Sequence, residues 1–182
     1  MTFREYFMKM RGSTRGSPPR VSNSEIFWSW VGAFMGIAAC GVLNQYYFSG
    51  LDLTLMIGSF GASAVLAYGA IRSPLAQPRN LIGGHFVSAV VGVIAWKLLH
   101  ATPWVAEAAA VATAIAVMHA TRTLHPPGGA TALIAVIGSP TIHNLGWYYV
   151  LIPATVGPLI LLLVALLVNN IPGTRRYPEV WF

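Results

Sequence analysis

Long runs of apolar residues, separated by short polar turns, fill the chain between residues 26 and 168. About 20 consecutive apolar residues are enough for a helix that crosses the hydrocarbon core of a membrane. Six segments can be distinguished, at about residues 26–48, 53–71, 81–99, 104–120, 126–137 and 147–168. The second is rich in small residues, the fifth is short, and the sixth contains Pro153 and Pro158, so we expect it to be kinked. The pattern predicts an all-helical integral membrane protein.

The composition supports this prediction. Apolar residues make up 55% of the chain and charged residues only 9%, against roughly 25% charged residues in soluble domains. So few charges cannot cover a surface that faces water. The net charge of +6 could indicate nucleic-acid binding, but the cations gather near the two ends of the chain, as they do beside membrane segments. We therefore expect membrane lipids as partners, and no nucleic acid.

The arginines indicate how the segments are oriented. If residues 1–24 begin in the cytoplasm, six crossings bring every arginine of the later chain to the cytoplasmic side: Arg72, Arg79, Arg122, Arg175 and Arg176. We expect a transmembrane domain over residues 25–170 and a cytoplasmic tail over residues 171–182, in a bacterial inner membrane. Residues 1–24 are basic with apolar residues at helical spacing, which predicts an amphipathic helix on the cytoplasmic surface.

An internal repeat bears on the number of crossings. The stretch "GASAVL" at 61–66 matches "GATALI" at 129–134. With six crossings, the second and fifth segments run in opposite directions, so the two halves would be inverted repeats of three segments each, with the second segment of each half short or broken. The alternative is four full helices plus two re-entrant half-helices. In folds of this kind, ligands bind where short helices meet, because helix N-termini attract anions. The alternative is that these glycines only allow neighbouring helices to pack closely.

Three motifs in order resemble the HPP family of integral membrane proteins. They are "GSFGASAVL" at 58–66, "SPLAQPRNLIGGH" at 73–85 and "TRTLHPPGGATAL" at 121–133, and the similarity extends over about residues 26–168. The family is usually described with four transmembrane helices, and some of its cyanobacterial and chloroplast members transport nitrite. The resemblance implies a small-anion transporter or channel, with nitrite or a similar monovalent anion as its substrate.

The candidate anion site joins small polar residues of the second and fifth segments to nearby cations. Backbone N–H groups around 61–63 and 128–130 would hold the anion, and hydroxyl groups would orient it. His125 is either a brace at the start of the fifth segment or a protonatable group that couples anion uptake to protons. The two arginines of this set have inner-leaflet anchoring as their alternative role. The full set is Ser59, Gly61, Ser63, Arg79, His85, Arg122, His125, Gly128, Gly129 and Thr131.

Other chemistry finds less support in the sequence. The histidines are scattered, without a carboxylate or thiolate cluster, so we expect neither a metal nor another cofactor. No nucleophile–base arrangement points to an enzyme; the alternative function is a membrane enzyme or assembly factor acting on a lipid or cofactor. We expect Lys97 and Glu107 to pair across a short turn, and His143 to be incidental. The small residues Gly32 and Gly36 favour close helix contacts in a homo-oligomer.

Overall fold

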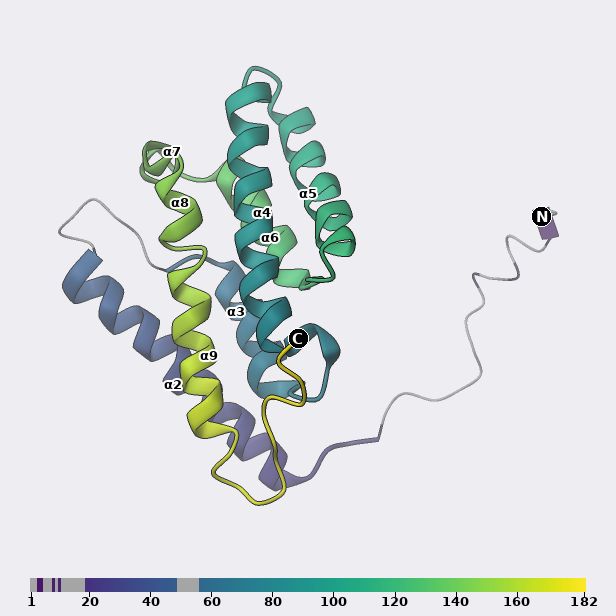
Figure 1. The fold of residues 1–182 in the computed structure, drawn as a ribbon, viewed down its shortest axis with the longest axis vertical. Helices are drawn as coiled ribbons and strands as arrows, with labels where there is room; N and C mark the ends of the chain where they lie inside the picture. Colours follow the sequence, from purple (N-terminus) through teal and green to yellow (C-terminus); the bar gives the residue numbers. More distant parts are fainter. Residues whose placement is uncertain (1–2, 5–7, 9, 11–18, 49–55) are drawn as a thin grey trace.

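The computed structural model describes residues 3–4, 8, 10, 19–48 and 56–182 (Figure 1). These residues form helices and connecting turns, with no strand in the ranges just given. The predicted surface helix of residues 1–24 and the start of the second segment fall mostly outside them. The elements in order are α2 (Asn23–Leu43), the π-helix η1 (Asn44–Phe48), α3 (Ser59–Ala64), the π-helix η3 (Val65–Gly69), the 3₁₀ turn η4 (Pro74–Ala76), α4 (Pro78–Leu99), α5 (Pro103–Ala120), α6 (Pro126–Ile137), α7 (Pro140–Leu145), α8 (Tyr148–Leu151) and α9 (Val156–Val168).

Four helical stretches are long and apolar enough to cross a membrane, and the protein is an integral membrane protein with these candidate spans. They are Asn23–Phe48, Pro78–Leu99, Pro103–Ala120 and Tyr148–Val168. The last is interrupted between α8 and α9, beside Pro153, where the sequence predicts a kink. The all-helical prediction is confirmed for the described residues.

Among the described residues, the helices of the second and fifth segments are shorter than the four candidate spans. Helix α6 has 12 residues, so it is about 18 Å long against a hydrocarbon core of about 30 Å. The described residues thus hold four long apolar helices together with shorter ones, and α6 is short, as predicted for the second segment of each half. The sequence explains why α6 is short. It begins at a Pro-Pro pair, which suits a first helical turn, and it ends before Gly138 and Pro140.

Helices α3 and α6 lie against each other in the interior and run in opposite directions (Figure 1). Ser59, at the start of α3, contacts Thr131 in the second turn of α6. Ser63, one turn further along α3, contacts His125, the residue before α6. The N-terminal halves of the two helices thus lie side by side in opposite directions, instead of meeting end to end.

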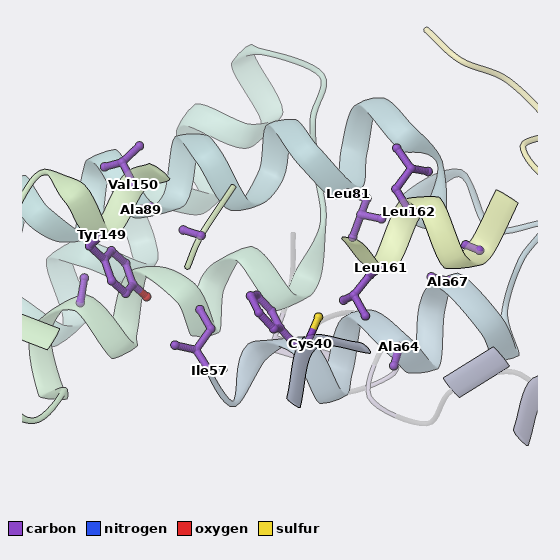
Figure 2. Packing of buried hydrophobic residues seen from close by; sticks show 14 of the residues in the cluster. Cys40, Ile57, Ala64, Ala67, Leu81, Ala89, Tyr149, Val150, Leu161 and Leu162 are labelled. Atoms are coloured by element: carbon purple, nitrogen blue, oxygen red, sulfur yellow. The ribbon is translucent and has the colours of Figure 1, made fainter. Parts of the chain in front are cut away.

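Helix α4 is the centre of the fold. It packs along α5 and α6 on one side and against α8 and α9 on another, while α2 packs on α9 and η3. Gly92 permits the close approach of α4 and α6, because a Cβ there would lie 2.6 Å from the carbonyl oxygen of Ala132. The apolar core draws Cys40, Ala64, Leu81, Tyr149 and Leu161 from five different helices (Figure 2).

Two packing predictions need correction. Gly32 and Gly36 face the ring of Tyr68 of the same chain, so these two glycines serve the fold itself and leave the homo-oligomer a prediction without their support. Lys97 and Glu107 do not pair; the ion pair found in the described part of the chain joins Arg175 to Glu25. The short turn after α4 brings the two helices together but does not bring these two side chains into contact.

Candidate functional site: a buried histidine–hydroxyl cluster

Five polar side chains meet in the interior where α3, α4 and α6 pack together. We call this set the polar cluster: Ser59, Ser63, His85, His125 and Thr131. Each is at most 1% exposed. The two imidazole ring centroids lie 5.1 Å apart, and the Phe60 and His85 rings form a T-shaped pair with centroids 5.8 Å apart. Buried polar groups need hydrogen-bond partners, because burial removes them from bulk water.

The polar cluster satisfies its polar atoms as one chain of hydrogen bonds. His125 Nδ1 lies 2.8 Å from the carbonyl oxygen of Leu75, and His125 Nε2 lies 3.0 Å from Ser63 Oγ. Ser63 Oγ lies 2.7 Å from His85 Nε2. His85 Nδ1 is 2.7 Å from Thr131 Oγ1, which is 2.9 Å from Ser59 Oγ. The chain therefore runs from a main-chain carbonyl through both imidazoles to a serine.

The Leu75 carbonyl sets the hydrogen positions along this chain. A carbonyl oxygen can only accept, so His125 Nδ1 carries a hydrogen and donates it. If His125 is neutral, its Nε2 accepts from Ser63. Ser63 then has no hydrogen left for His85, so His85 Nε2 donates to Ser63, and His85 Nδ1 accepts from Thr131. Both rings are thereby assigned single tautomers by their partners.

A second complete pattern exists with one more proton. Each hydrogen along the chain can move across its hydrogen bond, one step closer to His125. His125 Nε2 then carries a hydrogen and donates it to Ser63, so the His125 ring becomes an imidazolium. Thr131 in this pattern donates to Ser59, which receives the added proton. The contacts that link His125, Ser63, His85, Thr131 and Ser59 persist in both patterns, since hydroxyl groups donate and accept alike. Ser59 is the donor to Thr131 in the first pattern, whereas Thr131 donates to Ser59, as in the structure, in the second. The arrangement can thus pass a proton from Ser59 to His125 and hold it there.

Local sequence explains why these side chains meet. Ser59 and Ser63 are four residues apart and share one face of α3. His125 precedes Pro126, whose ring keeps it in an extended conformation outside the helix. Gly84 leaves the space that the His125 side chain occupies. Asn80 of α4 holds the segment before α6 in place, because its side chain donates to the carbonyl of Leu124 at 2.8 Å.

The family profile of the HPP transmembrane region matches residues 18–178. The chain belongs to the HPP family. It is 46% identical over 183 residues to one transmembrane protein of Dictyostelium discoideum, a match that covers 99% of this chain and 58% of that relative. A second transmembrane protein of the same organism is 45% identical over 182 residues, covering 98% of this chain and 64% of the relative. This chain thus spans 58% and 64% of the length of the two relatives. No solved structure matches it.

The polar cluster brings together half of the residues predicted for the site of this HPP-family chain. Ser59, Ser63, His85, His125 and Thr131 all belong to it. Gly128 lies beside it, at the point where α6 meets α4: a Cβ there would be 2.7 Å from Ser88 Oγ.

The other predicted residues lie elsewhere. Arg79 donates to the carbonyl of Thr121 at 2.9 Å, after the end of α5. Arg122 is exposed, with φ of 58°, a left-handed conformation that is uncommon outside glycine. Gly61 is exposed and has open space beside it. Gly129 points toward a groove between α5 and α6, with Val111 3.9 Å from its potential Cβ.

Two of the predicted backbone donors, those of Gly61 and Gly128, are already bonded within the chain. Gly61 N donates to Gly58 O at 3.3 Å and Gly128 N to His125 O at 2.8 Å. Pro126 and Pro127 have no N–H to offer. The hydrogen-bonding capacity of this site therefore comes from imidazoles and hydroxyls instead of helix N-termini.

Three groups in or beside the site were not predicted from the sequence. The first is the Leu75 carbonyl, which no sequence signal marks because every residue has one. The second is Tyr149, whose hydroxyl donates to the main-chain oxygen of Thr131 at 2.8 Å. The third is Ser88, a buried hydroxyl on α4 that has no hydrogen-bond partner among the described residues. Ser88 follows His85 by three residues and so shares its helical face, which means that its place beside the site could have been predicted.

The neighbouring glycines Gly128 and Gly129 predict opposite mutational effects. Gly128→Ala forces a Cβ against Ser88 Oγ and the Gly84 carbonyl, and overpacking of this kind costs about 1–3 kcal/mol. Gly129→Ala meets only ordinary van der Waals contact and gains about 1 kcal/mol of helix propensity. We expect a lower thermal unfolding midpoint in detergent for the first variant and an unchanged or higher one for the second. Equal effects of the two substitutions would contradict this packing.

Proposed function

We propose that this HPP-family protein carries a small monovalent anion, such as nitrite, across the membrane together with a proton. One observation carries the proposal: two buried histidines, in a membrane protein, are linked through hydroxyls and have no carboxylate among their hydrogen-bond partners. Ionisable groups inside membrane proteins generally mark ion pathways or proton relays.

The absence of a carboxylate partner determines what the polar cluster would favour. A buried imidazolium is costly without a counter-charge. An anion that reaches the polar cluster would supply that charge, so protonation and anion binding would stabilise each other by thermodynamic linkage. Because the hydrogen bonds of the polar cluster are internal, the anion would displace one of them, with Ser63 between the two imidazoles as the exchangeable partner.

The surrounding architecture supports a transport role. The opposite directions of α3 and α6 are those expected if the two halves are inverted repeats, an arrangement typical of transporters. Three arginines line a pocket at the end of the molecule where the tail lies, together with Glu179: Arg72, Arg175 and Arg176. This excess of arginines supports a cytoplasmic position for that end. In our proposal the exposed Arg72 and Arg176 attract anions electrostatically, without belonging to the polar cluster.

Anion and proton flux in proteoliposomes tests the proposal. We expect uptake of nitrite to acidify the lumen, with one proton per anion, and to rise when the outside is made more acidic. Because protonated nitrite crosses bilayers unaided, protein-free liposomes and nitrate are run in parallel, together with formate, chloride and bicarbonate. Lack of flux above protein-free liposomes for all five anions would refute the proposal. Anion flux without proton movement would refute the coupling.

A further inference from the structure

A small cavity opens at the end of the molecule opposite the tail, near α7 (Figure 1). We call it the outer cavity; the residues that matter in it are Trp96 and Lys97 of α4, His143 of α7 and Tyr149 of α8. Its volume is about 80 Å³. Organic ligands generally need pockets of about 300–1,000 Å³, whereas a water molecule takes about 30 Å³ of liquid volume. Size alone restricts an occupant to waters or one small ion.

The charge of the outer cavity is positive. Apart from Arg122, Lys97 is the only lysine or arginine in residues 80–174, and no ion pair holds it in the described part of the chain. Lys97 is exposed and lines the outer cavity, and a cation there raises the local concentration of anions. The histidine of the outer cavity adds rigidity: its ring stacks on Trp96 with centroids 3.8 Å apart and planes at 10°.

The His143 ring is also fixed at its far edge. His143 Nε2 lies 3.0 Å from the carbonyl oxygen of Val136 and must donate to it. The wall of the outer cavity formed by Trp96 and His143 is therefore held by a stack and a hydrogen bond at once. We predicted that His143 is incidental; the structure instead gives it a structural role in this wall.

Tyr149 connects the outer cavity to the polar cluster. Its side chain lines the outer cavity, is 1% exposed, and donates to the main-chain oxygen of Thr131 at 2.8 Å. The hydroxyl of the same threonine bonds His85 at 2.7 Å. Tyr149 thus touches both the outer cavity and the residue whose hydroxyl bonds His85.

We propose that the outer cavity is a binding site for a small monovalent anion at the outer mouth of the pathway, with the Lys97 ammonium as its attracting charge. This inference rests on the proposed function, since it makes the outer cavity the place where an anion waits before it reaches the polar cluster. The ligand class is a halide or a three- to four-atom oxyanion. Tyr149 is the barrier between the two sites.

Charge replacement at position 97 tests the inference in the full-length protein. The parent is Cys40→Ser, which removes the buried native thiol. Lys97→Cys is then labelled with membrane-impermeant thiol reagents that add either a trimethylammonium or a sulfonate group. We expect the KM for external nitrite to rise roughly tenfold in Lys97→Cys, the size of one charge-assisted hydrogen bond. The ammonium label should restore KM to within about twofold of the parent, and the sulfonate label should raise KM further.

Leu98→Cys is the matched control, because Leu98 follows Lys97 directly and is 74% exposed without lining the outer cavity. Neither label should change KM there. Binding is also read directly, as the rise in unfolding midpoint that sodium nitrite produces in the ammonium-labelled and sulfonate-labelled forms of Lys97→Cys. The inference predicts a larger rise with the ammonium label.

The two readouts separate the inference from the proposed function. If the labels act alike on both KM and the nitrite-induced rise, the inference is overturned, even where flux persists and depends on the polar cluster. If the rise follows the label's charge while no anion is transported, the inference stands as a binding site and the proposed function falls.

Discussion

Replacing His125 by asparagine is expected to lower proton-coupled anion flux on the order of 100-fold, the lower end of what a positioned proton-transfer group contributes. The asparagine amide can still donate to the Leu75 carbonyl, as His125 Nδ1 does at 2.8 Å. It cannot hold a proton, so the chain of hydrogen bonds would end at Ser63. Flux and lumenal acidification in proteoliposomes give the measurement. His119→Gln, which replaces an exposed histidine of α5, should leave both unchanged.

The polar cluster should also behave as one unit. Ser63→Ala removes the only link between the two imidazoles, and we expect it to reduce flux as much as His125→Asn. The double variant should then be no worse than either single variant, because a relay that is already interrupted cannot be interrupted again. Additive losses would indicate that the two side chains act separately, and flux above half of the parent level in His125→Asn would exclude the relay.

Replacing Glu25 by glutamine is expected to destabilise the fold by about 3–5 kcal/mol, the cost of leaving a buried charge without its partner. The Arg175 side chain is 1% exposed and lies 2.9 Å from the Glu25 carboxylate. Its Nε donates to that carboxylate at 3.0 Å. Its Nη2 also donates to Glu25 O and Ser29 Oγ, both at 2.8 Å, and its Nη1 donates to Asn169 Oδ1 at 3.2 Å. One guanidinium thus joins the start of α2 to the end of α9 and the tail.

Reversible unfolding in mixed detergent would measure this loss. Glu179→Gln is the control, since Glu179 is an exposed carboxylate of the same tail and exposed charges contribute about 0–1 kcal/mol. Arg175→Lys should recover only part of the stability, because an ammonium has three donors on a single nitrogen and cannot span the same partners. An effect of Glu25→Gln no larger than that of Glu179→Gln would contradict the role of the buried pair.

Sequence was most informative where local chemistry fixes structure. The limits of α6 were predictable from Pro126 and from the Ser-Pro that follows Ile137, because proline starts helices and interrupts them. Ser59, Ser63 and Thr131 were found through the match between two short apolar segments. The positive-inside pattern was a weaker guide to the number of crossings, since it counts charges on loops and does not measure the length of the helix between them.

Other features of the site depend on long-range packing. Helical spacing shows that Gly128 and Gly129 face different directions but not which of them faces α4, because that rotation is set by contacts of α6 with the rest of the fold. The same holds for Arg79: its place next to the predicted site in the sequence did not reveal that it would bond the carbonyl of Thr121. Tyr149 reaches the site from 18 residues beyond Thr131, a distance over which periodicity carries no information.

The main-chain acceptor at Leu75 has a consequence for how this site can vary during evolution. Every other partner of the two histidines is a side chain that a single codon change can delete. The acceptor that orients His125 survives any substitution at position 75 that keeps the turn, because it belongs to the backbone. The residue at position 75 can therefore change during evolution, while its carbonyl oxygen still accepts the hydrogen bond from His125. Homologues with the same relay should accordingly tolerate varied side chains at this position, and Leu75→Met or Leu75→Val should transport like the parent.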